Sequence, residues 1–201
     1  MSINVCNDRS MASITSLPSG VFGGSLILLS TQTASSSATI NFTSGIDSTY
    51  KEYQFHFTSI HPGTDDADTL ILGSIDSGSN YNVAITSSFV QAVAPESGGS
   101  PSVDYLTSKD VAQGTSGAAI EHSVGADNDQ SSSGILHLFN PASTTFVKHF
   151  ISRMHISHAV NNAQDILVAG YFNTASAIDA IQFKKNTGNI DSGIIKMYGV
   201  A

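Results

Sequence analysis

The sequence predicts an all-β protein, an antiparallel β-sandwich of which the jelly roll is one candidate form, with an extended N-terminal arm. Apolar strand-like segments recur about once per dozen residues, separated by turn-forming residues. Convincing helical periodicity is nearly absent from the chain. Charged residues make up only 12% of the 201 positions, so Ser, Thr, Asn and Gln must build the polar surface.

Residues 1–24 are predicted to form an arm or anchor. They have no strand or helix periodicity, and Pro18, Gly20, Gly23 and Gly24 interrupt regular structure. Apolar residues within this segment favour its ordering on a neighbouring subunit. Residues 25–201 are predicted to form a single β-sandwich domain, since all-β domains of about 200 residues are commonly one unit.

The first half of the domain contains the clearest strand. Tyr53, Phe55 and Phe57 alternate with polar residues, which is the period of a half-buried strand. Pro62, Gly63 and an acidic cluster end it. The other strands predicted in this half cover residues 26–29, 38–42, 69–74, 81–85 and 89–93.

An exposed loop is predicted over residues 94–102. It contains Pro95, Gly98, Gly99 and Pro101, and a proline there argues against a central strand. The strands predicted after this loop cover residues 118–124, 135–139, 146–152, 166–172, 177–184 and 194–198.

Charge and cysteine content exclude several classes of function. The net charge is −8 and the eight Lys and Arg residues are scattered, whereas nucleic-acid binding needs clustered cations, so we expect no nucleic-acid partner. Cys6 is the single cysteine, which excludes intrachain disulfides and cysteine-based zinc sites. The apolar run Leu26–Leu29 is far shorter than a bilayer span, and the first twenty residues make a poor signal peptide. We expect no membrane insertion.

Two patterns were candidates for metal binding. His155 and His158 lie three residues apart, downstream of His149, but residues three apart in a strand point to opposite faces. The acidic clusters Asp65, Asp66, Asp68 and Asp127, Asn128, Asp129 could offer oxygen ligands to calcium, yet neither follows the EF-hand pattern and such residues commonly cap turns. We assign no metal-binding residue.

No motif predicts catalysis. The chain has no Gly-x-Ser-x-Gly elbow, and Cys6 falls in the predicted arm. Glu52, Glu96 and Glu121 are the only glutamates, and there is no Trp to stack on a sugar ring. The glycines of residues 20–24 match neither a P-loop nor a dinucleotide fingerprint. We therefore expect a non-enzymatic protein without catalytic or cofactor-binding residues.

The aromatic residues could line a ligand groove in part, but core packing fits better because most lie in alternating strand segments. The set is Phe42, Tyr53, Phe55, Phe57, Phe139, Phe146, Phe150, Phe172 and Phe183.

Four phrases resemble small virion-associated structural proteins of tailed phages, especially phages of marine bacteria and cyanobacteria. They are Gly45–Phe57 followed by Ile60–Pro62, Gly134–Phe150, Ala169–Phe183 and Gly188–Gly199. The resemblance implies a virion component and supplies no catalytic residue. Arg153–Asp165 and the loop near Glu96 are the segments in which we expect a partner or receptor contact.

The resemblance implies an exterior protein of the tail-fibre or baseplate type that takes part in host adsorption, with a surface glycan as its ligand. One alternative is a capsid decoration protein that serves cohesion alone. Another is a glycan-degrading virion enzyme, which would need two acids to converge in a cleft. Because a low-charge β-sandwich without disulfides suits a symmetric assembly, we expect a homo-oligomer, specifically a homotrimer, bound to other virion proteins.

Overall fold

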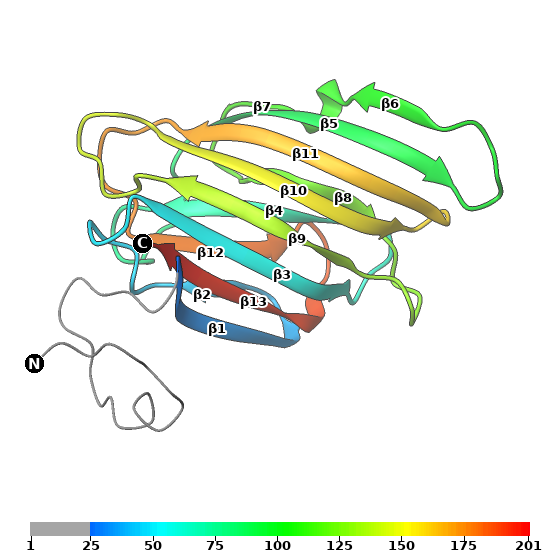
Figure 1. Cartoon of the computed structure of the whole chain (residues 1–201), viewed down its shortest axis with the longest axis horizontal. Helices are drawn as coiled ribbons and strands as arrows, with labels where there is room; N and C mark the ends of the chain where they lie inside the picture. The colour runs from blue at the N-terminus through cyan, green and yellow to red at the C-terminus, as the bar shows by residue number, and fades with distance from the viewer. Residues whose placement is uncertain (1–24) are drawn as a thin grey trace, which may run out of the picture.

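A computed structural model describes residues 25–201, and this part of the chain is all-β and antiparallel, as predicted (Figure 1). The predicted arm, residues 1–24, lies outside the described residues. The elements are β1 (Leu26–Ser37), β2 (Ile40–Phe42), β3 (Glu52–Pro62), β4 (Ala67–Ser74), β5 (Ile85–Pro95), β6 (Ser102–Tyr105), η1 (Thr107–Lys109), β7 (Val111–Gly114), β8 (Ala118–Val124), β9 (Ser132–Phe139), β10 (Lys148–His158), β11 (Asn162–Phe172), β12 (Ala180–Lys185) and β13 (Ile190–Val200).

The strands form one sheet that curls until it is nearly closed. Its first part, here called the long stretch, runs β1-β13-β3-β9-β10-β11-β5, and both β6 and β7 pair with β5. Its second part, the short stretch, runs β8-β4-β12-β2. A single residue pair, His158 with Val124, joins β10 to β8 and so connects the two stretches. Figure 1 shows β3, β9, β10, β11 and β5 side by side in the long stretch.

Aromatic side chains hold the two stretches together. The rings of Phe55 and Phe57 on β3 lie 5.3 and 5.0 Å from the ring of Phe183 on β12, in edge-to-face geometry. Phe42 on β2 contacts Phe55 at 5.2 Å in the same way. Each such pair contributes about 0.5–1.5 kcal/mol beyond the area it buries. The core therefore lies between the long and short stretches.

Two lysines are buried beside this core. Lys185 at the end of β12 places its Nζ 3.1 Å from Oε1 of Glu121 on β8, and both side chains are fully buried. Lys148 donates from its Nζ to the backbone oxygens of Phe146 and Thr174, at 2.9 and 3.0 Å. Burial lowers the pKa of Lys148. The two hydrogen bonds of Lys148 join the β9–β10 connection to the residues that follow β11.

The predicted alternation of β3 is confirmed, because Tyr53, Phe55 and Phe57 are all buried. The strand predicted over 81–85 is wrong: residues 81–84 lie outside any strand and β5 begins at Ile85. The predicted loop is shorter than expected, since β5 continues to Pro95 and β6 begins at Ser102. Both β6 and β7 were missed, because neither has a buried residue to produce an apolar alternation.

Candidate functional site

The outer face of the long stretch is the main candidate for binding, because several large apolar side chains are exposed on it. The strand register aligns Ile135, Arg153, Leu167, Val90 and Tyr105 in one row across five strands, from β9 to β6. Neighbouring strands lie about 4.8 Å apart, so such side chains form a contiguous surface. Leu167 is 49% exposed and Tyr105 55%. An exposed apolar surface of this kind commonly marks a site of interaction.

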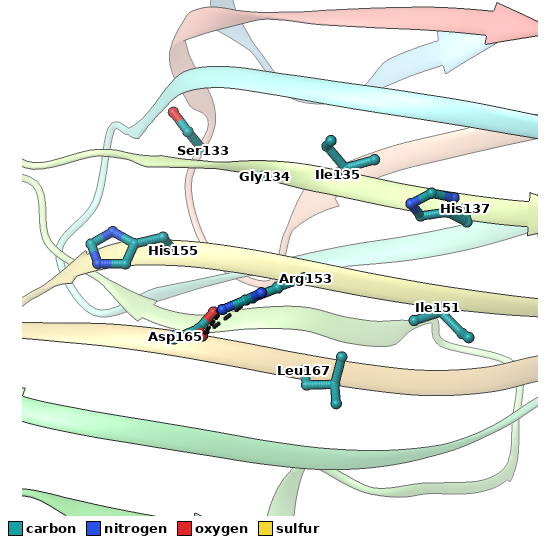
Figure 2. A pocket seen from close by; sticks show the side chains of 9 residues that line it. All are labelled: Ser133, Gly134, Ile135, His137, Ile151, Arg153, His155, Asp165 and Leu167. Carbon is teal, nitrogen blue, oxygen red and sulfur yellow. Dashed lines mark hydrogen bonds and ion pairs between the residues drawn. The ribbon is translucent and has the colours of Figure 1, made fainter. Parts of the chain in front are cut away.

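The central groove is a shallow hollow of about 650 Å³ in this face (Figure 2). It lies over β9, β10 and β11, and its lining consists of Ser133, Gly134, Ile135, His137, Ile151, Arg153, His155, Asp165 and Leu167. Figure 2 shows Arg153 and Asp165 meeting between the β10 and β11 ribbons, with the apolar side chains on either side.

The charges of the central groove largely neutralise each other. Arg153 binds Asp165 through two nitrogens, Nη2 to Oδ2 at 2.6 Å and Nε to Oδ1 at 3.0 Å. These hydrogen bonds lower the pKa of the Asp165 carboxyl. Asp165 is the only acidic residue among the nine that line the groove. The groove therefore lacks the two converging acids that glycoside hydrolysis requires.

A second hollow, here called the aromatic groove, has a volume of about 620 Å³ and shares Ile151 with the central groove. Tyr105, His149 and Tyr171 provide its rings, and the ring centroids of His149 and Tyr171 lie 5.9 Å apart. The Tyr105 hydroxyl donates to Oδ2 of Asp110 at 2.7 Å, which fixes the ring and raises the pKa of Tyr105. The other lining residues are Thr86, Ser87, Ser88, Phe150, Ala169 and Gly170.

The aromatic groove combines ring surfaces with hydroxyl groups. Thr86 and Ser88 point outward from β5 and are half-buried. Gly170 lines the groove with its backbone, because a side chain here would point toward the core, where its Cβ would meet the ring of the buried Phe150 at 2.6 Å and the Thr86 backbone oxygen at 2.7 Å. Concave sites with apolar walls and a few polar groups are typical of small-ligand binding.

The histidines singled out by sequence do not converge. His149 and His155 lie on the outer face of β10, in the aromatic and central grooves respectively. His158 at the end of β10 packs its ring 5.5 Å from that of His122 on β8. The predicted separation of His155 and His158 is confirmed. Over residues 25–201, no group of three or more His, Cys, Asp or Glu side chains is placed to hold a metal ion.

The two acidic clusters lie near each other, and Asp65 and Asp68 of the first cluster bind groups of the protein itself. Oδ1 of Asp65 accepts the Ala126 N–H at 3.0 Å, which links the turns after β3 and β8. Asp68 is buried, accepts the Ser123 N–H at 3.0 Å and binds Lys109 Nζ at 2.6 Å. The interpretation as a turn residue therefore fits Asp65, whereas it was wrong for Asp68, which lies in β4 and forms a part-buried ion pair with Lys109.

The three glutamates are far from forming a catalytic pair. Glu52 binds Nδ1 of His137 at 2.7 Å, Glu121 is buried with Lys185, and Glu96 lies on the connection between β5 and β6. Cys6 lies outside the described residues. No helix within residues 25–201 is long and apolar enough to cross a membrane.

The expected contact segment, Arg153–Asp165, forms the end of the β10–β11 hairpin and supplies Arg153, His155 and Asp165 to the central groove. Tyr105 and Tyr171 were not identified from sequence, because their strands gave no signal that distinguishes a groove wall from a core position. Seven of the nine aromatic residues assigned to the core are buried. Phe146, by contrast, is 69% exposed in the β9–β10 connection, and Phe139 is half-buried on the outer face, so both assignments were wrong.

Comparisons with models of protein families, with curated proteins and with solved structures found no match. The resemblance to phage virion proteins therefore stays a prediction.

Proposed function

We propose that the fold is a jelly roll extended along one edge. In a jelly roll, eight strands wound as two Greek keys form two sheets. Eight of the strands can be counted in chain order as one to eight: β1, β2, β3, β4, β8, β9, β12 and β13. With this count, the neighbours β1-β13-β3-β9 read one-eight-three-six, and the neighbours β2-β12-β4-β8 read two-seven-four-five. The remaining strands β10, β11, β5, β6 and β7 continue the first of these sheets. This strand order, with the aromatic contacts between the stretches, supports the sandwich arrangement.

We propose further that the protein is a non-enzymatic component of a tailed-phage virion, exposed on the tail fibre or baseplate, that binds a host surface saccharide. The aromatic groove is the observation that carries this proposal. The C–H face of a pyranose ring is apolar and can lie on an exposed tyrosine ring, while sugar hydroxyls can bond to neighbouring hydroxyl side chains. Tyr105 and Tyr171 offer the rings, and Thr86 and Ser88 offer the hydroxyls.

Binding of the full-length protein to polysaccharide purified from the host surface tests this function. We expect Tyr171→Ala to weaken binding at least tenfold, because a buried aromatic contact commonly contributes about 2 kcal/mol. Tyr198→Ala is a matched control, since Tyr198 is half-buried on the same face but contacts His56 on β3 instead of the groove. Absence of saccharide binding, or equal loss in both variants, would overturn the proposal.

Capsid decoration is the second candidate, and the exposed apolar side chains of Ile151 and Leu167 favour it. A protein that only holds capsomers together needs such cohesive surface and no saccharide site. Cryo-electron microscopy of intact particles separates the two functions. A few copies at the tail would support adsorption, whereas a regular lattice over the capsid would support decoration.

A further inference from the structure

The free edge of β1 is a further candidate for interaction. Within the described residues β1 pairs with β13 only, so the other side of Leu26–Thr33 carries a row of backbone N–H and C=O groups without a strand partner, whereas the Ser35 N–H and the Ser36 C=O bond to the side chains of Ser37 and Asn189. Figure 1 shows β1 at the margin of the molecule, beside β13. Such a row is a template for a further β-strand, because the backbone groups themselves specify an extended partner.

β1 lacks most of the features that protect edge strands. Natural edges are usually short, charged or interrupted by proline. The other terminal strands follow this rule, since β2 has three residues and β6 and β7 have four each. β1 has twelve residues and contains neither a charged residue nor a proline. Its pairing with β13 has one irregularity, a register shift between Leu28 and Ser30.

Exposed leucines accompany this open edge. Leu26 and Leu28 are 41% and 52% exposed and lie opposite Val200 and Tyr198 of β13. A strand added beside β1 would cover part of both leucine side chains, so apolar burial would add to the backbone hydrogen bonds. The edge therefore offers two independent sources of binding free energy.

The uncharged sequence of β1 permits a second copy of this chain as the partner. The net charge of −8 makes two copies repel each other over most of their surfaces. The uncharged edge is a place where identical strands can meet without like charges opposite one another, an arrangement that would be destabilising. Two identical strands that pair antiparallel are related by a twofold axis.

We propose that β1 pairs antiparallel with β1 of a second copy, so that the long stretch continues as one sheet through both chains. The product is a twofold dimer, which differs from the trimer expected from the sequence. This interface is separate from the saccharide groove, because β1 and β5 lie at opposite ends of the long stretch.

Two measurements on the full-length protein test the pairing. Sedimentation equilibrium should give twice the chain mass at high concentration. Amide hydrogen exchange over Leu26–Thr33 should be slower in concentrated than in dilute protein. Leu28→Lys should raise the dimer dissociation constant at least tenfold, because it replaces an apolar side chain that the added strand covers with a charged one. Leu167→Lys is the matched control, since Leu167 is equally exposed but lies on β11.

Each contrary result would overturn the pairing. A monomer at all concentrations or a trimer mass would exclude it, as would equal effects of the two lysine substitutions. Concentration-independent protection of β1 would show that another segment of the same chain covers the edge. The exchange measurement uses the unaltered protein, so it decides the matter even if Leu28→Lys fails to fold.

Discussion

Removing Lys185 should destabilise the fold strongly. The Lys185→Met variant leaves the fully buried Glu121 carboxylate with one hydrogen bond, from the Thr69 hydroxyl. The second carboxylate oxygen, Oε2, is already buried without a hydrogen-bond partner in the described structure. Because breaking a buried pair leaves an uncompensated charge, we expect a loss of about 3–5 kcal/mol of unfolding free energy. The double variant Lys185→Met, Glu121→Leu should recover most of this loss, since it removes both charges.

Urea denaturation followed by circular dichroism measures these differences. With a denaturant slope of about 2–3 kcal/mol/M, the single variant should lower the midpoint by about 1–2.5 M. Arg153→Met is the matched control, because it breaks an ion pair whose arginine is 74% exposed and should cost less than about 1 kcal/mol. The reasoning fails if Lys185→Met costs no more than this control. It also fails if the double variant is less stable than the single one.

Two further predictions concern the core and pH. Phe183→Ala should cost about 3–5 kcal/mol, because Phe183 contacts rings on both stretches, whereas the exposed Phe146→Ala should change stability by less than about 0.5 kcal/mol in the same denaturation assay. Burial lowers the pKa of His122 and His158, so the unfolded chain takes up protons near pH 6.5 before the folded chain does. Stability should therefore fall as pH drops from 7 to 5, and His122→Gln should flatten this dependence; a flat profile in the unaltered protein would contradict the burial argument.

The sequence predicts those strands in which one face is apolar and the other polar. β3 is the clearest case, because the core on one side and solvent on the other impose a strict alternation on residues 52–58. β6 and β7 gave no such signal, since none of their residues is buried. Residues 81–84 have a strand-like pattern because Tyr81 and Val83 alternate with polar residues. In the structure they form an irregular connection between β4 and β5.

The grooves could not be predicted, because they depend on register between strands far apart in sequence. Tyr105 and Tyr171 meet in one groove only because β5 lies between β6 and β11. The buried lysines are a related case. Lysine side chains are usually exposed, and the burial of Lys185 depends on its ion pair with Glu121, sixty-four positions away. Single-sequence patterns report local burial, whereas these sites arise from pairings that the local pattern does not contain.

The position of the aromatic groove has a consequence for how this protein could diversify. Its walls come entirely from β5, β6, β10 and β11, which lie outside the eight strands of the proposed jelly roll. If the groove binds the proposed saccharide, mutations that change its specificity can accumulate in these added strands while the eight-strand scaffold stays the same. Under the proposed function, exchanging residues 85–114 together with 148–172 between homologous chains should transfer saccharide preference as a unit.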